Sequence, residues 1–191
     1  DGHAHYRNRY VESRGLLAER EAGHALFGGL SNFSFPAPEV MEKAGMMKNT
    51  ANTNIIRHQQ RLLALMEAGT PIELADDLST VGEFDFDGSL SGPFTAHPKF
   101  DTSTGEMLAF GYLPFPPYLR YHTVAPDGSL RSVDIDAGRA TMMHDFVVTE
   151  RHAVFFDLPA VFDFDAMMSG GAGIRWDGDA GARIGVLHGT A

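Results

Sequence analysis

The sequence predicts an all-β fold, a partial β-propeller of about two to three blades with short helical segments near the N-terminus. Two segments, 93–112 (PFTAHPKFDTSTGEMLAFGY) and 141–159 (TMMHDFVVTERHAVFFDLP), each contain a histidine, a strand-like run, a polar turn and a second apolar run. Their histidines, His97 and His144, are 47 residues apart. One four-stranded blade takes roughly 40 to 50 residues, so the spacing matches one blade. From residue 49 onward, short apolar runs alternate with polar turns, which is typical of an all-β repeat.

Before residue 49 the pattern predicts one exposed strand and two short helical segments. Residues 3–12 suit an exposed strand, and the Asp1-Gly2 dipeptide before them is typical of a hairpin turn. Residues 16–30 contain helix formers and reach Gly28-Gly29, which predicts a short helix that stops at these glycines. Residues 39–49 predict one or two further helical turns.

After residue 49 the predicted strands are separated by recognisable turns. Strands at 54–58 and 62–67, joined by a tight turn, form a first hairpin, and another strand-like run covers 78–86. Residues 117–136 predict a second hairpin with Pro126-Asp127-Gly128 as its turn. The all-β interpretation depends on this alternation of strands and turns.

A third, weaker copy of the blade pattern begins near Thr50, which lies 47 residues before His97. Six or seven blades of about 45 residues each need more than the 191 residues of this chain. The chain also begins with Asp1 and ends within an apolar, strand-like run. We therefore expect residues 1–191 to form one partial propeller domain that is truncated at both ends.

The composition narrows the classes of partner. A net charge of −10, without a run of Lys or Arg, argues against nucleic acid, because proteins that bind it carry a basic face. The chain has no cysteine, so any metal would be bound by His, Asp or Glu. No apolar run approaches the ~20 residues that span a bilayer, and no leader is visible. A cytoplasmic location is the default expectation.

His97 and His144 are the candidate metal ligands. Both lie at the start of a predicted strand, and the first strands of successive blades approach a common axis, where neutral imidazoles can bind divalent iron, copper or zinc. The alternative for each is a buried histidine that is hydrogen-bonded to backbone. Glu67 ends the apolar run LLALME and could accept the second N–H of a ligating histidine; its alternative is an edge glutamate that faces water. The other histidines are expected to be exposed: His3, His5, His24, His58, His122, His152 and His188.

Several strings of the chain carry a family resemblance. KNTANTNII, LLALMEAGTP, GPFTAHPKFD followed by TGEMLAFGY, and MMHDFVVTERHAVFFDLP resemble, in order and spacing, the carotenoid oxygenase family, also called carotenoid cleavage dioxygenases. This family includes apocarotenoid and lignostilbene dioxygenases and the retinal pigment epithelium isomerohydrolase. The resemblance extends from residue 6 to residue 187, which is nearly the whole chain.

The resemblance implies a seven-bladed propeller with a non-haem Fe(II) ion on its axis, held by four histidines. The histidine of FTAHPK is the first ligand in the family and that of MHDF is the second, which correspond to His97 and His144. The glutamate of the ALxE segment corresponds to Glu67, one of three carboxylates around the ligands. The third and fourth ligands and the other two glutamates lie in parts of the family sequence beyond this chain's last residue. His188 matches neither missing ligand motif.

The reaction that the resemblance implies is oxidative cleavage by O₂ of a carbon–carbon double bond in a conjugated polyene or stilbene, which gives two carbonyl products. An apolar tunnel would hold the substrate, and Phe94, Phe110, Tyr112 and Phe115 are candidate lining residues. The alternative for each is ordinary core packing. Stilbene-cleaving members carry a lysine beside the glutamate, where this chain has Met66, which favours a carotenoid or apocarotenoid.

Members of the family also touch the bilayer through an apolar patch, to which residues 164–173 (FDAMMSGGAG) could contribute. The expected location is therefore cytoplasmic and peripheral to the membrane. Three rival interpretations remain open: a stilbene-cleaving dioxygenase, an isomerohydrolase on the same iron site, and a propeller segment that serves as a non-catalytic binding module. Because two imidazoles leave most of the coordination shell to water, we expect the isolated chain to bind Fe(II) weakly and to be inactive.

Overall fold

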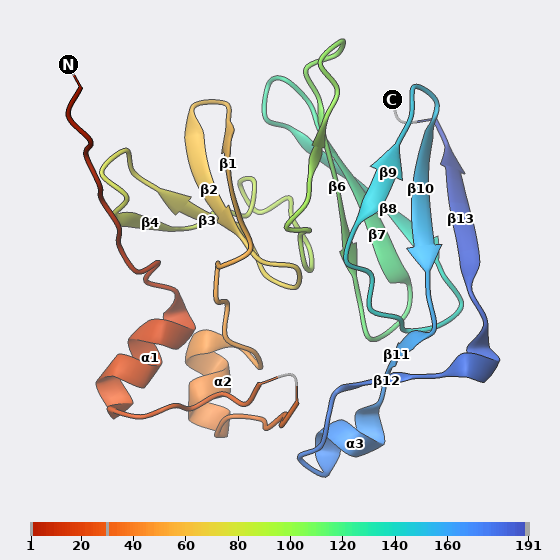
Figure 1. The fold of residues 1–191 in the computed structure, drawn as a ribbon, viewed down its shortest axis with the longest axis horizontal. Coiled ribbons are helices and arrows are strands. Elements are labelled where there is room, and N and C mark those ends of the chain that lie inside the picture. The colour runs from red at the N-terminus through yellow and green to blue at the C-terminus, as the bar shows by residue number, and fades with distance from the viewer. Residues whose placement is uncertain (1, 30, 190–191) are drawn as a thin grey trace.

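Four antiparallel β-sheets dominate the computed structural model, which describes residues 2–29 and 31–189 (Figure 1). The first sheet is a meander of four strands in chain order. Gln59 and Gln60 join its first two strands with positive φ values of 46° and 65°, a turn geometry that matches the twist of a hairpin. The predicted hairpin over 54–67 is confirmed, and the structure adds a strand at 72–74 that the pattern did not predict. The strands are β1 (Asn54–His58), β2 (Arg61–Leu65), β3 (Ile72–Leu74) and β4 (Thr80–Glu83).

The second sheet repeats this meander with four further strands in chain order. Its last two strands form the hairpin predicted over 117–136. In the turn of this hairpin the Asp127 carboxylate accepts the Ser129 N–H, and Gly128 has a φ of 92° that suits glycine. The strands are β5 (Lys99–Phe100), β6 (Met107–Tyr112), β7 (Tyr118–Val124) and β8 (Leu130–Asp136).

The third sheet has the strand order β13-β10-β9, and the chain makes an excursion between β10 and β13. The excursion contains a two-stranded sheet, a short helix and a 3-10 turn. The elements are β9 (Phe146–Val148), β10 (His152–Asp157), β11 (Ala160–Phe162), α3 (Phe164–Met168), β12 (Ile174–Trp176), η1 (Gly178–Ala180) and β13 (Arg183–His188). The first strands of the three larger sheets begin at residues 54, 99 and 146, at spacings of 45 and 47 residues. This periodicity confirms the predicted repeat.

Two helices precede the sheets, as predicted, but the first has different limits. α1 (Arg14–Ala22) begins after Ser13, whose hydroxyl accepts an N–H of the first turn, and it ends at Gly23 with a φ of 73°. A glycine in the left-handed conformation caps the helix there, so the chain leaves it before the predicted stop at Gly28-Gly29. α2 (Pro38–Ala44) covers the first part of the second predicted segment, 39–49, and ends at Gly45.

The expected strand at residues 3–12 is wrong, because this segment has no regular secondary structure. It passes the edge of β4, where the Glu12 backbone N–H donates to the Thr80 hydroxyl at 2.8 Å instead of joining a backbone ladder. Alternating side chains alone do not make a strand, since its N–H and C=O groups need a paired neighbour. Asp1 of the predicted hairpin turn lies outside the described residues.

The middle sheet is buried on both faces. Along β6, Met107 and Ala109 point into a core shared with the first sheet, whereas Leu108 and Phe110 point into a core shared with the third sheet. All four side chains are at most 1% exposed. Successive side chains of a strand point to opposite faces, so a strand covered on both sides is apolar at consecutive positions. This explains the uninterrupted apolar run in this strand.

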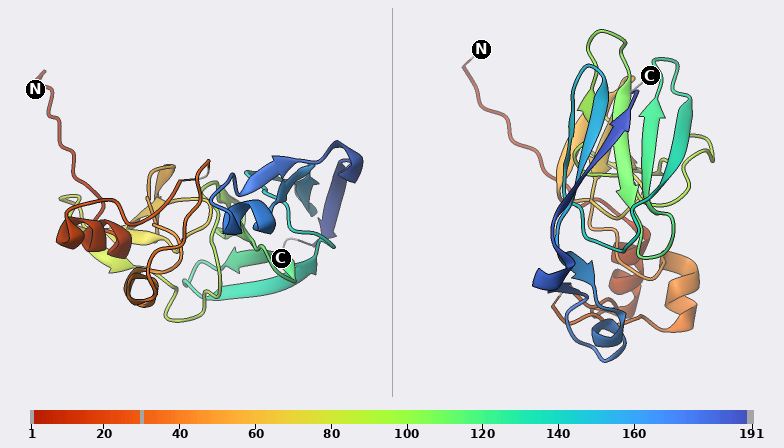
Figure 2. Two further views of the ribbon diagram at one scale, coloured as in Figure 1. Left: turned by 90° about the horizontal axis from the view of Figure 1, so that it is seen from below. Right: turned by 90° about the vertical axis from the view of Figure 1, so that its right-hand side faces the viewer.

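The three larger sheets follow one another along the longest axis of the molecule, from β1–β4 to β9, β10 and β13 (Figure 1). The helices α1, α2 and α3 gather at one end of the sheets (Figure 2, right). Within the described residues the sheets do not close into a ring, as expected of a partial propeller. None of the described helices has the length and apolar character needed to cross a membrane.

Candidate metal centre

Glu67, His97 and His144 lie together, each in a loop beside one of the three larger sheets. One ligand atom from each side chain lies within 4.8 Å of the other two. The imidazole centroids of His97 and His144 are 4.6 Å apart, with the rings inclined at 62°. Glu67 follows β2, His97 precedes β5 and His144 precedes β9, so each sheet contributes one residue. The structure thus brings together the three residues selected from the sequence.

Hydrogen bonds to the first sheet fix the backbone that carries His97. The Phe94 N–H donates to the Gly69 carbonyl at 3.1 Å, and the Asn54 amide donates to the Ala96 carbonyl at 3.0 Å. The His97 N–H donates to the buried Thr95 hydroxyl at 3.0 Å. Because Gly69 lies in the loop after β2 and Asn54 begins β1, the loop before β5 is held against the neighbouring sheet.

The Glu67 carboxylate forms an ion pair with Nδ1 of His144. The Glu67 side chain is 18% exposed and the His144 side chain 58% exposed, so the acid is the more enclosed partner. When Nδ1–H donates to the carboxylate, the lone pair of the imidazole lies on Nε2, the atom left to bind a metal. This contact places Glu67 where it can orient the ring of His144 and favour the tautomer with the proton on Nδ1.

A second ion pair joins the segments that carry the two histidines. The Lys99 ammonium donates to Oδ1 of Asp145 at 2.8 Å and lies 5.5 Å from the centre of the Phe146 ring. Burial opposes ionisation of Asp145, but the hydrogen bonds from Lys99 and the Phe146 N–H outweigh it and lower the pKa of this carboxyl. Lys99 lies two residues after His97, and Asp145 directly follows His144. This pair was not predicted from the sequence, although a charged residue of opposite sign near each histidine was a signal for it.

The donor set fits a divalent transition metal. Nε2 of His97 is buried and has no hydrogen-bond partner among the described residues, which is costly for a polar atom unless a ligand satisfies it. Two imidazoles bound at about 2.1 Å to one ion have centroids roughly 4.5 to 5 Å apart, close to the observed 4.6 Å. Neutral imidazole suits iron, copper and zinc better than it suits magnesium or calcium.

The four candidate lining residues occupy different environments. Phe94 and Phe110 are fully buried in two separate cores, so their geometry favours the packing alternative. Burial and the nearby Glu67 carboxylate raise the pKa of Tyr112 above its usual value, which places its phenol beside the candidate centre. Phe115 is 61% exposed and lies outside both cores. The lining role of all four residues stays a prediction.

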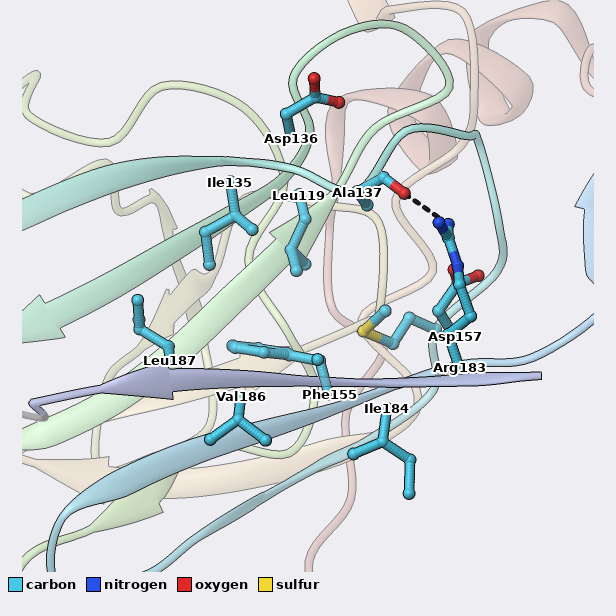
Figure 3. Close-up of a pocket in the computed structure, with 12 residues that line it drawn as sticks. Leu119, Ile135, Asp136, Ala137, Phe155, Asp157, Arg183, Ile184, Val186 and Leu187 are labelled. Atoms are coloured by element: carbon cyan, nitrogen blue, oxygen red, sulfur yellow. Dashed lines mark hydrogen bonds and ion pairs between the residues drawn. The ribbon is translucent and has the colours of Figure 1, made fainter.

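A cleft of about 310 Å³ lies between β7–β8 and β10–β13 (Figure 3), and none of the three clustered residues lines it. Leu119, Phe155 and Leu187 form its apolar wall. At its rim, Arg183 donates to the Ala137 carbonyl at 2.6 Å. The apolar residues of its wall also belong to the core between the second and third sheets. The cleft is therefore the open edge of the interface between these two sheets.

Two of the histidines expected at the surface are buried, which corrects the sequence interpretation. His58 is 8% exposed and His122 is fully buried. His122 stacks on Phe94 with centroids 5.9 Å apart, and its Nδ1 is hydrogen-bonded to the Ser132 hydroxyl at 2.8 Å. These strands looked peripheral in the sequence, but the adjoining sheet covers the face on which both rings lie.

The chain resembles known proteins along almost all of its length. A family model described as retinal pigment epithelial membrane protein matches residues 1–190. Carotenoid 9,10(9',10')-cleavage dioxygenase 1 of Phaseolus vulgaris is 37% identical over 205 residues, covering 98% of this chain and 38% of the relative. The crystal structure of Pseudomonas brassicacearum lignostilbene dioxygenase has a TM-score of 0.84 at 38% identity, covering 94% of this chain and 38% of that one.

A cobalt-substituted apocarotenoid oxygenase of Synechocystis gives a TM-score of 0.75 at 26% identity, covering 96% of this chain and 42% of that one. The chain thus spans about two fifths of the length of these proteins. The family match, the identities and the propeller sheets around a His-His-Glu cluster agree with one another. The chain belongs to the carotenoid oxygenase family, the family of the retinal pigment epithelial membrane protein.

Proposed function

We propose that this chain supplies two of the ligands of a non-haem Fe(II) centre that cleaves a carbon–carbon double bond with O₂. The observation that carries the proposal is the convergence of His97 and His144 from neighbouring sheets, with Glu67 paired to one of them. The dioxygenase names of the relatives and the cobalt-substituted relative support it. In the overall reaction, one alkene and O₂ give two carbonyl products.

In that reaction, the residues of this chain would bind the metal ion and orient its ligands. His97 and His144 would hold the ion through neutral nitrogen atoms, and the ion, when bound, supplies the redox chemistry that O₂ needs. The metal would keep its full positive charge, because a neutral imidazole brings no negative charge to it. Glu67 holds the Nδ1 proton of His144, so the ring keeps Nε2 directed away from the carboxylate. Since an alkene needs no ionisation, no general base has to be assigned.

The proposed substrate is a carotenoid or apocarotenoid. Beside Glu67 the chain has Met66, whose sulfur accepts the Thr50 N–H at 3.3 Å. This thioether has no charge with which to hold a phenol, in contrast to the lysine that the stilbene-cleaving members carry there. The 38% identity to a lignostilbene dioxygenase favours the stilbene alternative. Turnover of β-apocarotenal and of resveratrol by the same protein decides between them.

We also propose that the protein touches a membrane surface around α3. Phe115 stacks on Phe164 with centroids 5.3 Å apart, and Met168 is exposed on the same helix as Phe164. These apolar groups would favour contact with a lipid surface. Flotation with phosphatidylcholine vesicles should recover the parent protein and less of Met168→Glu, whereas equal recovery would refute this contact.

The test of the iron proposal uses protein that carries this chain at the length of its relatives. His97→Ala and His144→Ala should each remove bound iron and product formation. His24→Ala, at an exposed histidine just after α1, should change neither. Iron content by mass spectrometry and products by chromatography are the measurements. Retained iron and cleavage in the ligand variants would refute the proposal.

Product analysis under ¹⁸O₂ tests the rival isomerohydrolase on the same iron site. Label in both carbonyl products identifies a dioxygenase, whereas an isomerised product without label from O₂ identifies the rival. A protein that contains iron and binds polyene but yields neither product would support the non-catalytic binding module. The expected result is label in both products.

A further inference from the structure

Two other histidines face each other at the end of the third sheet. His152 is the first residue of β10 and His188 the last of β13, and the antiparallel register pairs them directly. Their imidazole centroids are 5.1 Å apart, with the rings at 84°. His152 is half-buried and His188 is exposed, so water and ions can reach the pair.

The backbone around this pair is held firmly. The Thr149 N–H donates to the His152 carbonyl at 2.9 Å, and the His152 N–H donates to the Thr149 hydroxyl at 3.1 Å. On the other strand, the Gly189 N–H donates to the Arg151 carbonyl at 2.9 Å. The first two bonds close the turn between β9 and β10, and the third extends the β10–β13 pairing one residue beyond His188, so backbone hydrogen bonds hold the segments that carry both histidines.

The spacing of the two rings is compatible with two ligands on one tetrahedral ion. With metal–nitrogen distances of about 2.1 Å and a tetrahedral angle, two imidazole centroids lie roughly 5 Å apart. The observed 5.1 Å is slightly wider than the 4.6 Å at the candidate iron centre. Among the described residues, the hydrogen bonds of His152 come from its backbone, and the two rings contact each other, so both rings keep lone pairs for a metal.

We propose that His152 and His188 form a second metal site, which binds a divalent ion of the zinc class through two imidazoles and water. This site is distinct from the candidate iron centre. His144 precedes β9, whereas His152 lies at the other end of the β9–β10 hairpin, next to the turn. Asp157 and Arg183 already form an ion pair at the far end of the β10–β13 ladder. An ion on the histidines would join the two strands at the open end.

The test is a calorimetric titration with Zn²⁺ at neutral pH on protein that carries this chain at the length of its relatives. His97→Ala and His144→Ala together form the background, so that these two iron ligands do not compete. The background protein should bind one Zn²⁺ that His152→Ala and His188→Ala each weaken by at least about tenfold. His24→Ala in the same background is the matched control and should bind as the background protein does.

Thermal unfolding gives a second measurement that is independent of the binding heat. Zn²⁺ should raise the unfolding temperature of the background protein but not that of His152→Gln or His188→Gln, which retain polar side chains of similar size. Circular dichroism checks that these variants are folded. Equal Zn²⁺ affinity, or an equal rise in unfolding temperature, in the background protein and the histidine variants would overturn the proposal.

Discussion

At the scale of single residues, the contact between Glu67 and His144 is the most direct to test. Glu67→Ala removes the acceptor of the Nδ1 proton and should weaken metal binding by about 10 to 100-fold. Glu67→Gln should weaken it less, because the amide oxygen can still accept that proton. Metal affinity by competition titration is the measurement, with exposed Glu39→Ala on α2 as the control. Unchanged affinity in Glu67→Ala would show that the carboxylate does not orient His144.

A second residue-scale prediction concerns His122, which is buried and neutral. Burial lowers its pKa to about 4, from 6.5 for an exposed imidazole. Between pH 6.5 and 4 the unfolded chain binds a proton that the folded chain does not, so the free energy of unfolding falls as the pH falls. The loss is at most roughly 3 kcal/mol and is complete below the folded pKa.

The measurement for His122 is urea unfolding at several pH values between 7 and 4. His122→Gln should flatten the pH dependence in this range. A smaller dependence should remain, because burial also lowers the pKa of His58. If the variant and the parent lost stability in parallel, His122 would not be the titrating group.

The histidines also show how far residue-scale prediction from the sequence could go. His97 and His144 were predictable, because they occupy the same position in two successive copies of a blade-length pattern. The burial of His58 and His122 was not, since it depends on which sheet covers the strand. The Lys99–Asp145 pair was missed for a related reason: a contact between blades leaves only weak traces in the sequence.

At the scale of elements, the Lys99–Asp145 ion pair fixes the start of β5 relative to the start of β9. Both side chains are about one third to one half exposed, so the pair should add at most about 1 kcal/mol to stability. Its larger effect should be on the metal, because it sets the separation of the two histidine-bearing segments. Lys99→Ala and Asp145→Ala should each lower metal affinity several-fold with little change in unfolding.

A charge exchange separates this positional effect from general damage. The double variant Lys99→Asp with Asp145→Lys should recover part of the affinity that each alanine variant loses, as measured by the same metal titration. Lys43→Ala, on α2 and away from the metal residues, is the control. Single alanine variants that bind metal as the parent does would refute the positioning role.

Prediction of the elements succeeded where a local signal determined the structure. The turn at Pro126-Asp127-Gly128 and the apolar run of β6 each indicate one conformation, and both are confirmed. The strand expected at 3–12 failed, because its alternation had no backbone partner. β3 was missed for the opposite reason: it has only three residues, and pairing with β2 and β4 stabilises it.

At the scale of the whole molecule, the repeat of 45 to 47 residues predicted the order of the sheets but not how the sheets pack against one another. The two cores that join the three sheets combine residues from distant parts of the chain. Phe110, for example, packs on Phe146 and Phe155 with centroid distances of 5.0 and 5.9 Å. These contacts connect the sheet that carries His97 to the sheet that carries His144, so packing and metal geometry are coupled.

Because of this coupling, a defect in the core between the sheets should also affect the metal site. Phe110→Ala leaves a cavity between the second and third sheets and should lower the free energy of unfolding by about 3 to 5 kcal/mol. It should also weaken metal binding, since the two histidine segments lose their common support. Phe115→Ala, at an exposed phenylalanine nearby in the sequence, is the matched control and should cost less than about 1 kcal/mol. Urea unfolding and metal titration of both variants are the measurements. If Phe110→Ala lowered stability but left metal affinity at the parent value, each histidine would be positioned within its own sheet, and the coupling would be wrong.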